Sequence, residues 1–205
     1  FDNSQEFILA VSKFFTLTSA LIINKDALSD VNPDEFITTD IATFHIFLRA
    51  SLNSKKNLFV REFLIASKRQ NSFNYNYADV FVVQFWKILF NQRKHGLNEK
   101  TIQTLLKKRL LTYYPFYLYD LRLNSRADMH PIRQYLSKLY GDSILYRLWL
   151  LPIMVLPLYL GLAWGLFTTI IGRVIAGDLI RGLYFLRSKA LAFFWNRTVS
   201  KLRVQ

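Results

Sequence analysis

Side chains that could carry metal or acid–base chemistry are few in this 205-residue chain and lie far apart in sequence. Its three histidines, His45, His95 and His130, have no neighbour at the spacing of metal ligands. A lone histidine on a mostly apolar helix, such as His45, is more often a packing residue than a ligand. The chain has no cysteine, which excludes disulfides, thiolate metal sites and cofactors attached through a thioether. We therefore expect no enzyme activity, no catalytic or metal-binding residue and no covalently bound cofactor.

Two other groups of charged residues could have a chemical role. Asp178 is the one acidic residue after position 147, and an acid within an apolar segment can be functional. Arg181 at i+3 and Arg173 nearby can neutralise it, which favours a structural role. The basic residues Lys107–Arg109 could contact nucleic acid, but no nucleic-acid-binding motif accompanies them. Nucleic acid is therefore not an expected partner.

Charge is distributed unevenly along the chain, whose formal net charge is +13. Residues 1–60 carry 5 basic and 7 acidic side chains, and residues 61–147 carry 15 and 6. Residues 148–205 carry 7 basic side chains and 1 acidic one. A basic middle and tail indicate an anionic partner, which we expect to be membrane lipid or the acidic surface of another protein.

The most informative segment is residues 148–172, which has 25 positions without a charged side chain. About 20 apolar residues suffice to cross a bilayer, so this segment predicts a membrane helix. Pro152 and Pro157 predict that the helix is kinked there or begins after Pro157. The residues expected at or within the membrane are Trp149, Tyr159, Gly161, Trp164, Gly165, Arg173, Arg181 and Arg187.

Gly161 and Gly165 form a pair of small residues one helical turn apart, which would let another helix approach closely. Residues 173–205 mix basic and apolar side chains, as in an interfacial helix on anionic lipid. The alternative for this tail is a second helix packed against a partner subunit. Both flanks of the apolar segment are basic, so orientation is open and a re-entrant hairpin is an alternative to a single span.

The rest of the pattern is helical. An apolar stripe of Phe7, Ile8, Val11, Phe14 and Phe15 predicts a first helix. Residues 32–35 resemble a helix start, predicting a second helix from there to Leu52. Residues 80–90 predict a buried helix. Gly96 and Asn98 predict a helix end and the cap of the next helix, in which Ile102, Leu105 and Leu106 face inward. Breaks are expected at residues 113–115 and near His130–Pro131.

The fold class is therefore all-α. The predicted organisation is a helical soluble domain over residues 1–142, followed by a membrane segment over residues 143–172. That segment is expected to be a kinked transmembrane or re-entrant helix. A basic amphipathic helix on the membrane surface follows over residues 173–205.

Residues 45–125 resemble the phycobilisome linker domain, a helical module that threads discs of phycobiliprotein. The resemblance rests on Val60-Arg61-Glu62-Phe63, on the aromatic segment Asn76 to Phe90, and on Leu97 to Gln103. Leu52-Asn53 also resembles the lead-in to the first motif. The glycine-containing turn after the aromatic segment is replaced by Phe90-Asn91-Gln92-Arg93-Lys94, and the Ser-x-x-Tyr after the first motif is absent.

This resemblance implies a non-enzymatic, membrane-anchored linker that docks an antenna onto a thylakoid membrane or a photosystem. Its partners would be acidic phycobiliproteins or photosystem subunits, with room for lipid or non-covalently bound pigment. The expected docking residues are Arg61, Lys68, Arg69, Arg93, Lys94, Lys107, Lys108 and Arg109, with Phe73, Tyr75, Tyr113, Tyr114 and Tyr117 as exposed aromatic anchors. The main alternative is an accessory structural subunit of an energy-converting complex in a mitochondrial inner or plastid membrane. A less favoured alternative is a small membrane enzyme or transporter subunit that uses Asp178.

Overall fold

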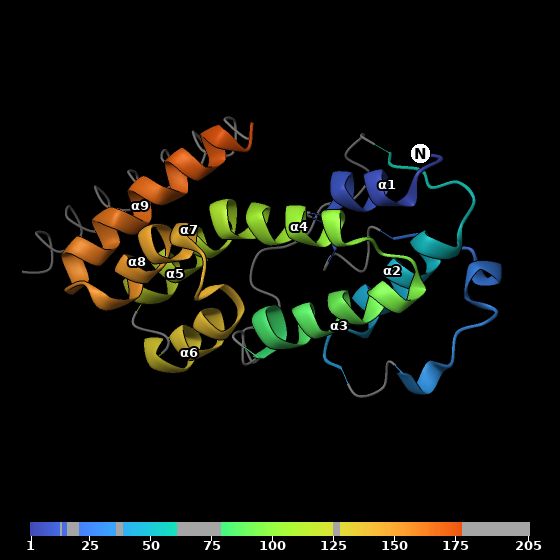
Figure 1. The fold of residues 1–205 in the computed structure, drawn as a ribbon, viewed down its shortest axis with the longest axis horizontal. Helices are drawn as coiled ribbons and strands as arrows, with labels where there is room; N and C mark the ends of the chain where they lie inside the picture. Colours follow the sequence, from blue (N-terminus) through green and yellow to red (C-terminus); the bar gives the residue numbers. More distant parts are fainter. Residues whose placement is uncertain (13, 16–20, 36–38, 61–78, 125–127, 178–205) are drawn as a thin grey trace, which may run out of the picture. The chain divides into compact units, whose positions relative to one another are not determined.

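A computed structural model describes residues 1–12, 14–15, 21–35, 39–60, 79–124 and 128–177. Every regular element in these described ranges is helical, which agrees with the predicted all-α class (Figure 1). The chain divides into two compact units. Unit 1 is residues Phe1–Leu106 with Gln134–Leu136, and unit 2 is Lys107–Arg133 with Ser137–Gln205. The boundary falls within the helix α4, Glu99–Thr112.

Unit 1 contains the helices α1 (Ser4–Val11), α2 (Ala42–Asn53) and α3 (Phe85–Asn91). It also contains the short helices η2 (Lys25–Leu28), η3 (Pro33–Glu35), η4 (Asp79–Gln84) and η5 (Gln92–His95). Aromatic rings form much of its core. The rings of Phe44 and Phe85 stack with centroids 4.5 Å apart, and the Phe15 ring lies 5.0 Å from that of Phe44. The buried residues Phe7, Ile8 and Val11 confirm the first part of the predicted apolar stripe, whereas Phe14 and Phe15 lie past the end of α1.

The second helix starts later than predicted. Asn32 does accept a hydrogen bond from the amide of Asp34 (3.0 Å), but the turn it opens ends at Glu35. The helix α2 begins only at Ala42. One reason is a long-range contact, because the amide of Asp40 donates to the side chain of Gln84 (2.9 Å). The local start signal therefore produces a single turn, whereas the predicted end near Leu52 is confirmed by the end of α2 at Asn53.

The segment around α3 and α4 follows the prediction closely. Residues 80–90 are helical, in η4 and α3, and Val80, Phe85 and Leu89 are buried. Gly96 has φ +95°, a left-handed conformation that glycine adopts without strain at a helix end. Asn98 accepts a hydrogen bond from the amide of Thr101 (2.7 Å), which caps α4. The inward-facing positions Ile102, Leu105 and Leu106 are all buried, as expected.

Unit 2 contains α5 (Tyr114–Leu123), α7 (Ile144–Trp149), α8 (Leu151–Val155) and α9 (Leu158–Ile175), together with most of α6 (Met129–Tyr140). The predicted break at residues 113–115 is confirmed by the end of α4 at Thr112. The break predicted near His130–Pro131 is not there, because α5 ends at Leu123 and α6 already begins at Met129. Pro131 instead occupies the first turn of α6, where a proline is tolerated, and Asp128 caps that turn by accepting from the amide of His130 (2.9 Å).

The uncharged run is divided among three helices, α7, α8 and α9, because the backbone breaks at Leu150 and at Leu156–Pro157. This confirms the expectation that the long helix begins after Pro157. It extends three residues past the predicted boundary at 172 to Ile175, and Gly177 beyond it is left-handed (φ +71°). The rest of the predicted amphipathic tail, residues 178–205, lies outside the described residues.

Candidate functional site

One face of α9 is built from small residues and is buried within unit 2. Gly161, Gly165, Thr168, Thr169 and Gly172 recur at the spacing of a single helical stripe, and all are buried. The helix packs on α5 and α8, as its position in Figure 1 shows. The prediction that Gly161 and Gly165 let another helix approach closely is therefore confirmed, and the approaching helix belongs to this same chain.

The glycines on this stripe leave little or no room for a side chain. A Cβ atom on Gly165 would lie 3.2 Å from the Cβ of Tyr119 in α5. A Cβ on Gly161 would overlap the guanidinium of Arg122, and one on Gly172 would overlap the backbone carbonyl of Leu111 at the end of α4. These three contacts fix α9 against the segment Lys107–Asn124 along almost its whole length.

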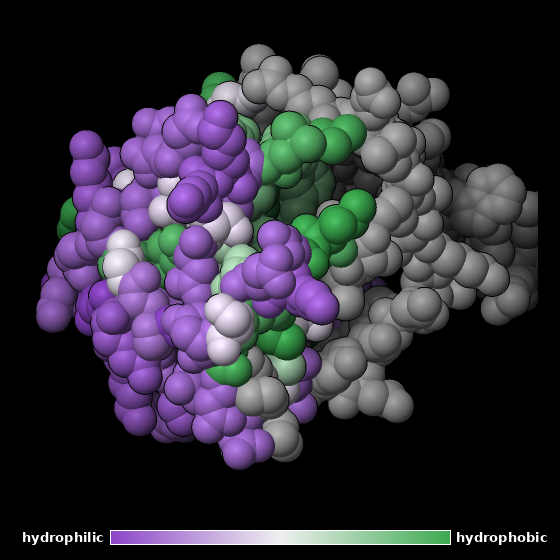
Figure 2. Space-filling view, turned by 90° about the vertical axis from the view of Figure 1, so that its right-hand side faces the viewer, coloured by the Kyte–Doolittle hydropathy of each residue, from purple (hydrophilic) through white to green (hydrophobic). Residues whose placement is uncertain are grey.

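The opposite face of α9 is exposed and apolar. Leu160, Phe167 and Val174 lie on one stripe and are 60%, 49% and 50% exposed. Tyr159, predicted to lie at the membrane, is 84% exposed. Other large apolar side chains exposed in unit 2 are Leu123, Ile144, Leu148, Val155, Leu158 and Ile175. By contrast, the described residues of the face shown in Figure 2 are mostly hydrophilic, with a smaller hydrophobic group.

Arg122 supports the break between α8 and α9. Pro157 has no backbone N–H, so it cannot donate to the carbonyl of Ile153 as a helical residue would. The Arg122 guanidinium donates to that carbonyl instead, and also to the carbonyl of Leu156 (2.9 Å). The cation thus satisfies two backbone acceptors that the break frees. Nothing in the local sequence marked this role, because Arg122 lies 31 residues before Ile153.

The two tryptophans expected at the membrane are partly buried and donate to backbone carbonyls. The indole N–H of Trp149 points to the carbonyl of Leu111 (3.4 Å), and that of Trp164 points to Leu148 (3.1 Å). The guanidinium of Arg173 lies 5.4 Å from the centre of the Phe116 ring on α5. These contacts hold α9 and α7 in place within unit 2. Arg181 and Arg187, also expected at the membrane, lie outside the described residues, as does Asp178.

The basic cluster at the end of α4 differs from the prediction at one residue. Lys107 is exposed and Lys108 is half-buried, but the guanidinium of Arg109 is buried, 4.8 Å from the centre of the Tyr113 ring. Burial lowers the pKa of Arg109 below its usual range, which nearby Tyr114 and Tyr140 partly oppose. Arg109 lies seven residues after Ile102 and so continues the buried face of the helix. The expectation that Arg109 faces a partner is therefore wrong.

The predicted aromatic anchors at residues 113–117 are also mostly internal. Tyr114 is fully buried, so it is not an exposed anchor. Tyr113 and Tyr117 are half-buried with their rings stacked 6.3 Å apart, and burial raises the pKa of both hydroxyls. The tyrosines cluster here because α5 begins directly after α4 and its first turn packs into unit 2.

Other predicted docking residues lie in unit 1 or outside the described residues. Arg93 forms an ion pair with Glu99 (2.9 Å) and lies 4.6 Å from the centre of the Phe90 ring, whereas Lys94 is exposed. The residues outside the described ranges are Arg61, Lys68, Arg69, Phe73 and Tyr75.

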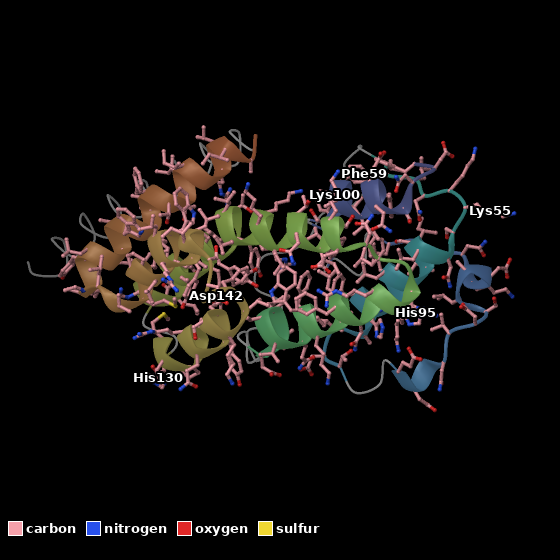
Figure 3. All side chains as sticks on the ribbon, viewed as in Figure 1. Lys55, Phe59, His95, Lys100, His130 and Asp142 are labelled. Atoms are coloured by element: carbon pink, nitrogen blue, oxygen red, sulfur yellow. The ribbon has the colours of Figure 1, made fainter. Side chains whose placement is uncertain are left out.

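Two histidines that are distant in sequence lie near enough in unit 1 to influence each other's pKa. His45 on α2 is buried, and burial is the main cause of its lowered pKa. His95 on η5, labelled in Figure 3, also has a pKa lowered mainly by burial, and each imidazole lowers the other's further. Arg49, paired with Asp30 at 3.4 Å, adds to both effects. Within the described ranges, no group of three or more His, Cys, Asp or Glu side chains could hold a metal ion.

Comparisons with known proteins add no family to this picture: no family model matches the chain, and no curated protein or solved structure does. Among the described residues, α9 is the one helix that is long and apolar enough to cross a membrane by length and composition. Only 28% of that helix is buried. The exposed apolar face of α9 is therefore the best-supported candidate for a membrane-contact site. Leu148 and Val155, in the two helices that precede α9, are also exposed.

Proposed function

We propose that this chain is a non-enzymatic subunit that attaches a protein assembly to a membrane through unit 2. The observation that carries the proposal is the exposed face of α9, where large apolar side chains stand opposite a small-residue face that is already packed. Soluble monomers rarely leave a continuous apolar surface of this kind uncovered. The excess of basic residues in unit 2 also favours this unit as the attachment site. Unit 2 carries 15 basic and 4 acidic residues, net +11, whereas unit 1 carries 12 and 10, net +2.

The favoured assembly is a light-harvesting antenna. This choice depends on the resemblance of residues 45–125 to phycobilisome linker domains, which are basic and bind acidic phycobiliproteins. Exposed cations such as Lys94 and Lys107 would face the acidic partner, and the host membrane would be a thylakoid. In the alternative, the chain is an accessory subunit of an energy-converting complex in a mitochondrial inner or plastid membrane.

Membrane attachment is tested with the full chain in its native membranes. Alkaline carbonate washing should leave the protein in the membrane fraction. Replacing Phe167 with Asp should release it, because the charge is placed on the exposed face of α9. Leu58→Asp is the matched control, since Leu58 is an exposed apolar residue of unit 1 (82%) and its replacement should release nothing. Recovery of the unaltered protein in the soluble fraction would contradict the proposal.

The choice of assembly is tested by isolating the complex with mild detergent and recording its absorption spectrum. An antenna linker should co-purify with bilin-containing protein. The chain itself should show no bilin fluorescence on a denaturing gel, because covalent bilins are held by thioethers to cysteine and the chain has none. A membrane complex without bilin would favour the alternative subunit and exclude the antenna role.

A further inference from the structure

The segment Lys107–Asn124, which packs along α9, limits how α9 can be placed in a bilayer. Gly161 lies against Arg122, Gly165 against Tyr119, and Gly172 against Leu111. As the chain proceeds along α9, these neighbours run backwards through α5 into α4, so the two segments are antiparallel. The segment Lys107–Asn124 therefore flanks α9 from its first turn to its last.

This flanking segment is charged. Asp120 directly follows Tyr119, whose side chain lies against Gly165 near the middle of α9. Arg122 lies beside the first turn of α9. Lys107 and Lys108 come shortly before Leu111 in the sequence, and the backbone carbonyl of Leu111 contacts Gly172. If α9 spanned a bilayer, this segment would enter the hydrocarbon with it, and Asp120 would lie near the bilayer centre. Charged residues are most unfavourable at that depth.

The exposed face of α9 fits a different geometry. Leu160, Ala163, Phe167 and Val174 lie on one stripe of the helix and are all exposed. This stripe lies on the side of α9 away from the flanking segment, because the glycines that contact the segment lie on the opposite stripe. A helix with one apolar face, held in a unit of net charge +11, has the features of an interfacial helix on anionic lipid.

We infer that α9 lies in the plane of an anionic membrane, with its exposed stripe inserted into one leaflet and the flanking segment on the aqueous side. The inference rests on the proposed membrane attachment and specifies its geometry. Unit 2 would then be monotopic: it attaches to one surface, and α9 does not cross the bilayer.

The absence of native cysteine allows this geometry to be measured directly. Single cysteines at Leu160, Phe167 and Val174 are labelled with the fluorophore NBD, in the full chain reconstituted into phosphatidylglycerol–phosphatidylcholine vesicles. Lipids carrying a quencher at defined acyl positions then report the depth of each probe. Leu58→Cys in unit 1 is the control for a probe that stays in water, and circular dichroism confirms that each variant keeps its helix content.

An in-plane helix should place all three α9 probes at the same shallow depth, with a blue shift and increased emission on binding that the Leu58 probe lacks. A spanning helix would place the Phe167 probe deepest and the Leu160 and Val174 probes near opposite surfaces, whichever way the protein inserted. That result would overturn the in-plane geometry but leave membrane attachment intact. Binding with all three probes still in water would show that α9 is not the contact. Absence of binding to any vesicle would contradict both the geometry and the proposed function.

Discussion

At the scale of single residues, neighbours in the sequence have opposite environments. Lys107 and Arg109 are two positions apart on α4, and both belong to the basic cluster that the sequence presents. Lys107 is exposed, whereas the guanidinium of Arg109 is buried against the ring of Tyr113. Arginine is suited to such a site because its planar guanidinium stacks on aromatic faces and donates in several directions.

Replacing Arg109 with Gln should therefore destabilise the protein by about 2–3 kcal/mol, because it removes a buried stacking group and leaves partner groups without a donor. Lys107→Gln makes the same change in charge at an exposed position and should alter the free energy of unfolding by less than about 0.5 kcal/mol. Chemical denaturation followed by circular dichroism measures both. Equal effects would show that the guanidinium of Arg109 is not buried as described.

His45 should make stability depend on pH. Burial lowers its pKa, so the unfolded chain binds protons more readily than the folded chain. Stability should accordingly fall as pH decreases below about 6.5, the ordinary pKa of histidine, and should be constant with respect to this group above it. His45→Gln should make this dependence shallower, while the contribution of His95, whose pKa is also lowered by burial, remains. His130→Gln, which removes an exposed histidine of α6, is the matched control. Denaturation midpoints measured from pH 5 to 8 provide the comparison.

At the scale of elements, α9 combines two faces with different tasks. The small-residue face is packed internally, where Thr168 and Thr169 donate to backbone carbonyls of their own helix, Thr169 to Gly165 at 2.6 Å. The large apolar residues on the opposite face contribute little to internal packing. The two faces should therefore respond differently to substitution.

Gly172→Ala should destabilise unit 2 by about 1–3 kcal/mol, because its methyl group would overlap the backbone carbonyl of Leu111 and overpacking against backbone is costly. Helix propensity alone would predict a gain of about 1 kcal/mol, so the sign of the change is diagnostic. Ala163→Leu on the exposed face should leave the denaturation midpoint unchanged. A more stable Gly172→Ala variant would show that α9 does not pack as described.

At the scale of the whole molecule, charge is divided between the units. The unit with the exposed apolar helix has a net charge of +11, and the other has +2. Cations near an anionic lipid surface each contribute about 1 kcal/mol to binding, so the charge and the apolar face should act together.

Replacing Lys107 and Lys138 of unit 2 with Gln should thus weaken binding to phosphatidylglycerol vesicles about tenfold or more. Replacing Lys55 and Lys56 of unit 1 with Gln removes the same charge and should have little effect; Lys55 extends outward in Figure 3. Vesicle co-sedimentation measures both. Raising the salt to about 1 M, where screening shortens to about 3 Å, should reduce the difference between the two variants. Equal losses at low salt would show that binding is not directed by unit 2.

Local sequence signals accounted for much of the fold. The cap at Asn98, the left-handed Gly96 and the helix start after Pro157 depend on the backbone preferences of single residues and their near neighbours. The same holds for the inward stripe of α4. A signal that competed with a distant contact was less reliable: the helix start at Asn32 yields one turn, and the amide of Asp40 is bound by Gln84, 44 residues further along the chain.

The sequence by itself determined the net charge, the exclusion of thiol chemistry, the long apolar segment and the small-residue pair at Gly161 and Gly165. Only the tertiary structure decided which face of α9 is covered, that the guanidinium of Arg109 points inward, and that His95 lies near enough to His45 to lower its pKa. The physical reason is that helical periodicity defines which residues share a face but not what packs against it. That choice depends on contacts between segments far apart in the chain, such as Arg122 with Ile153 and Leu156.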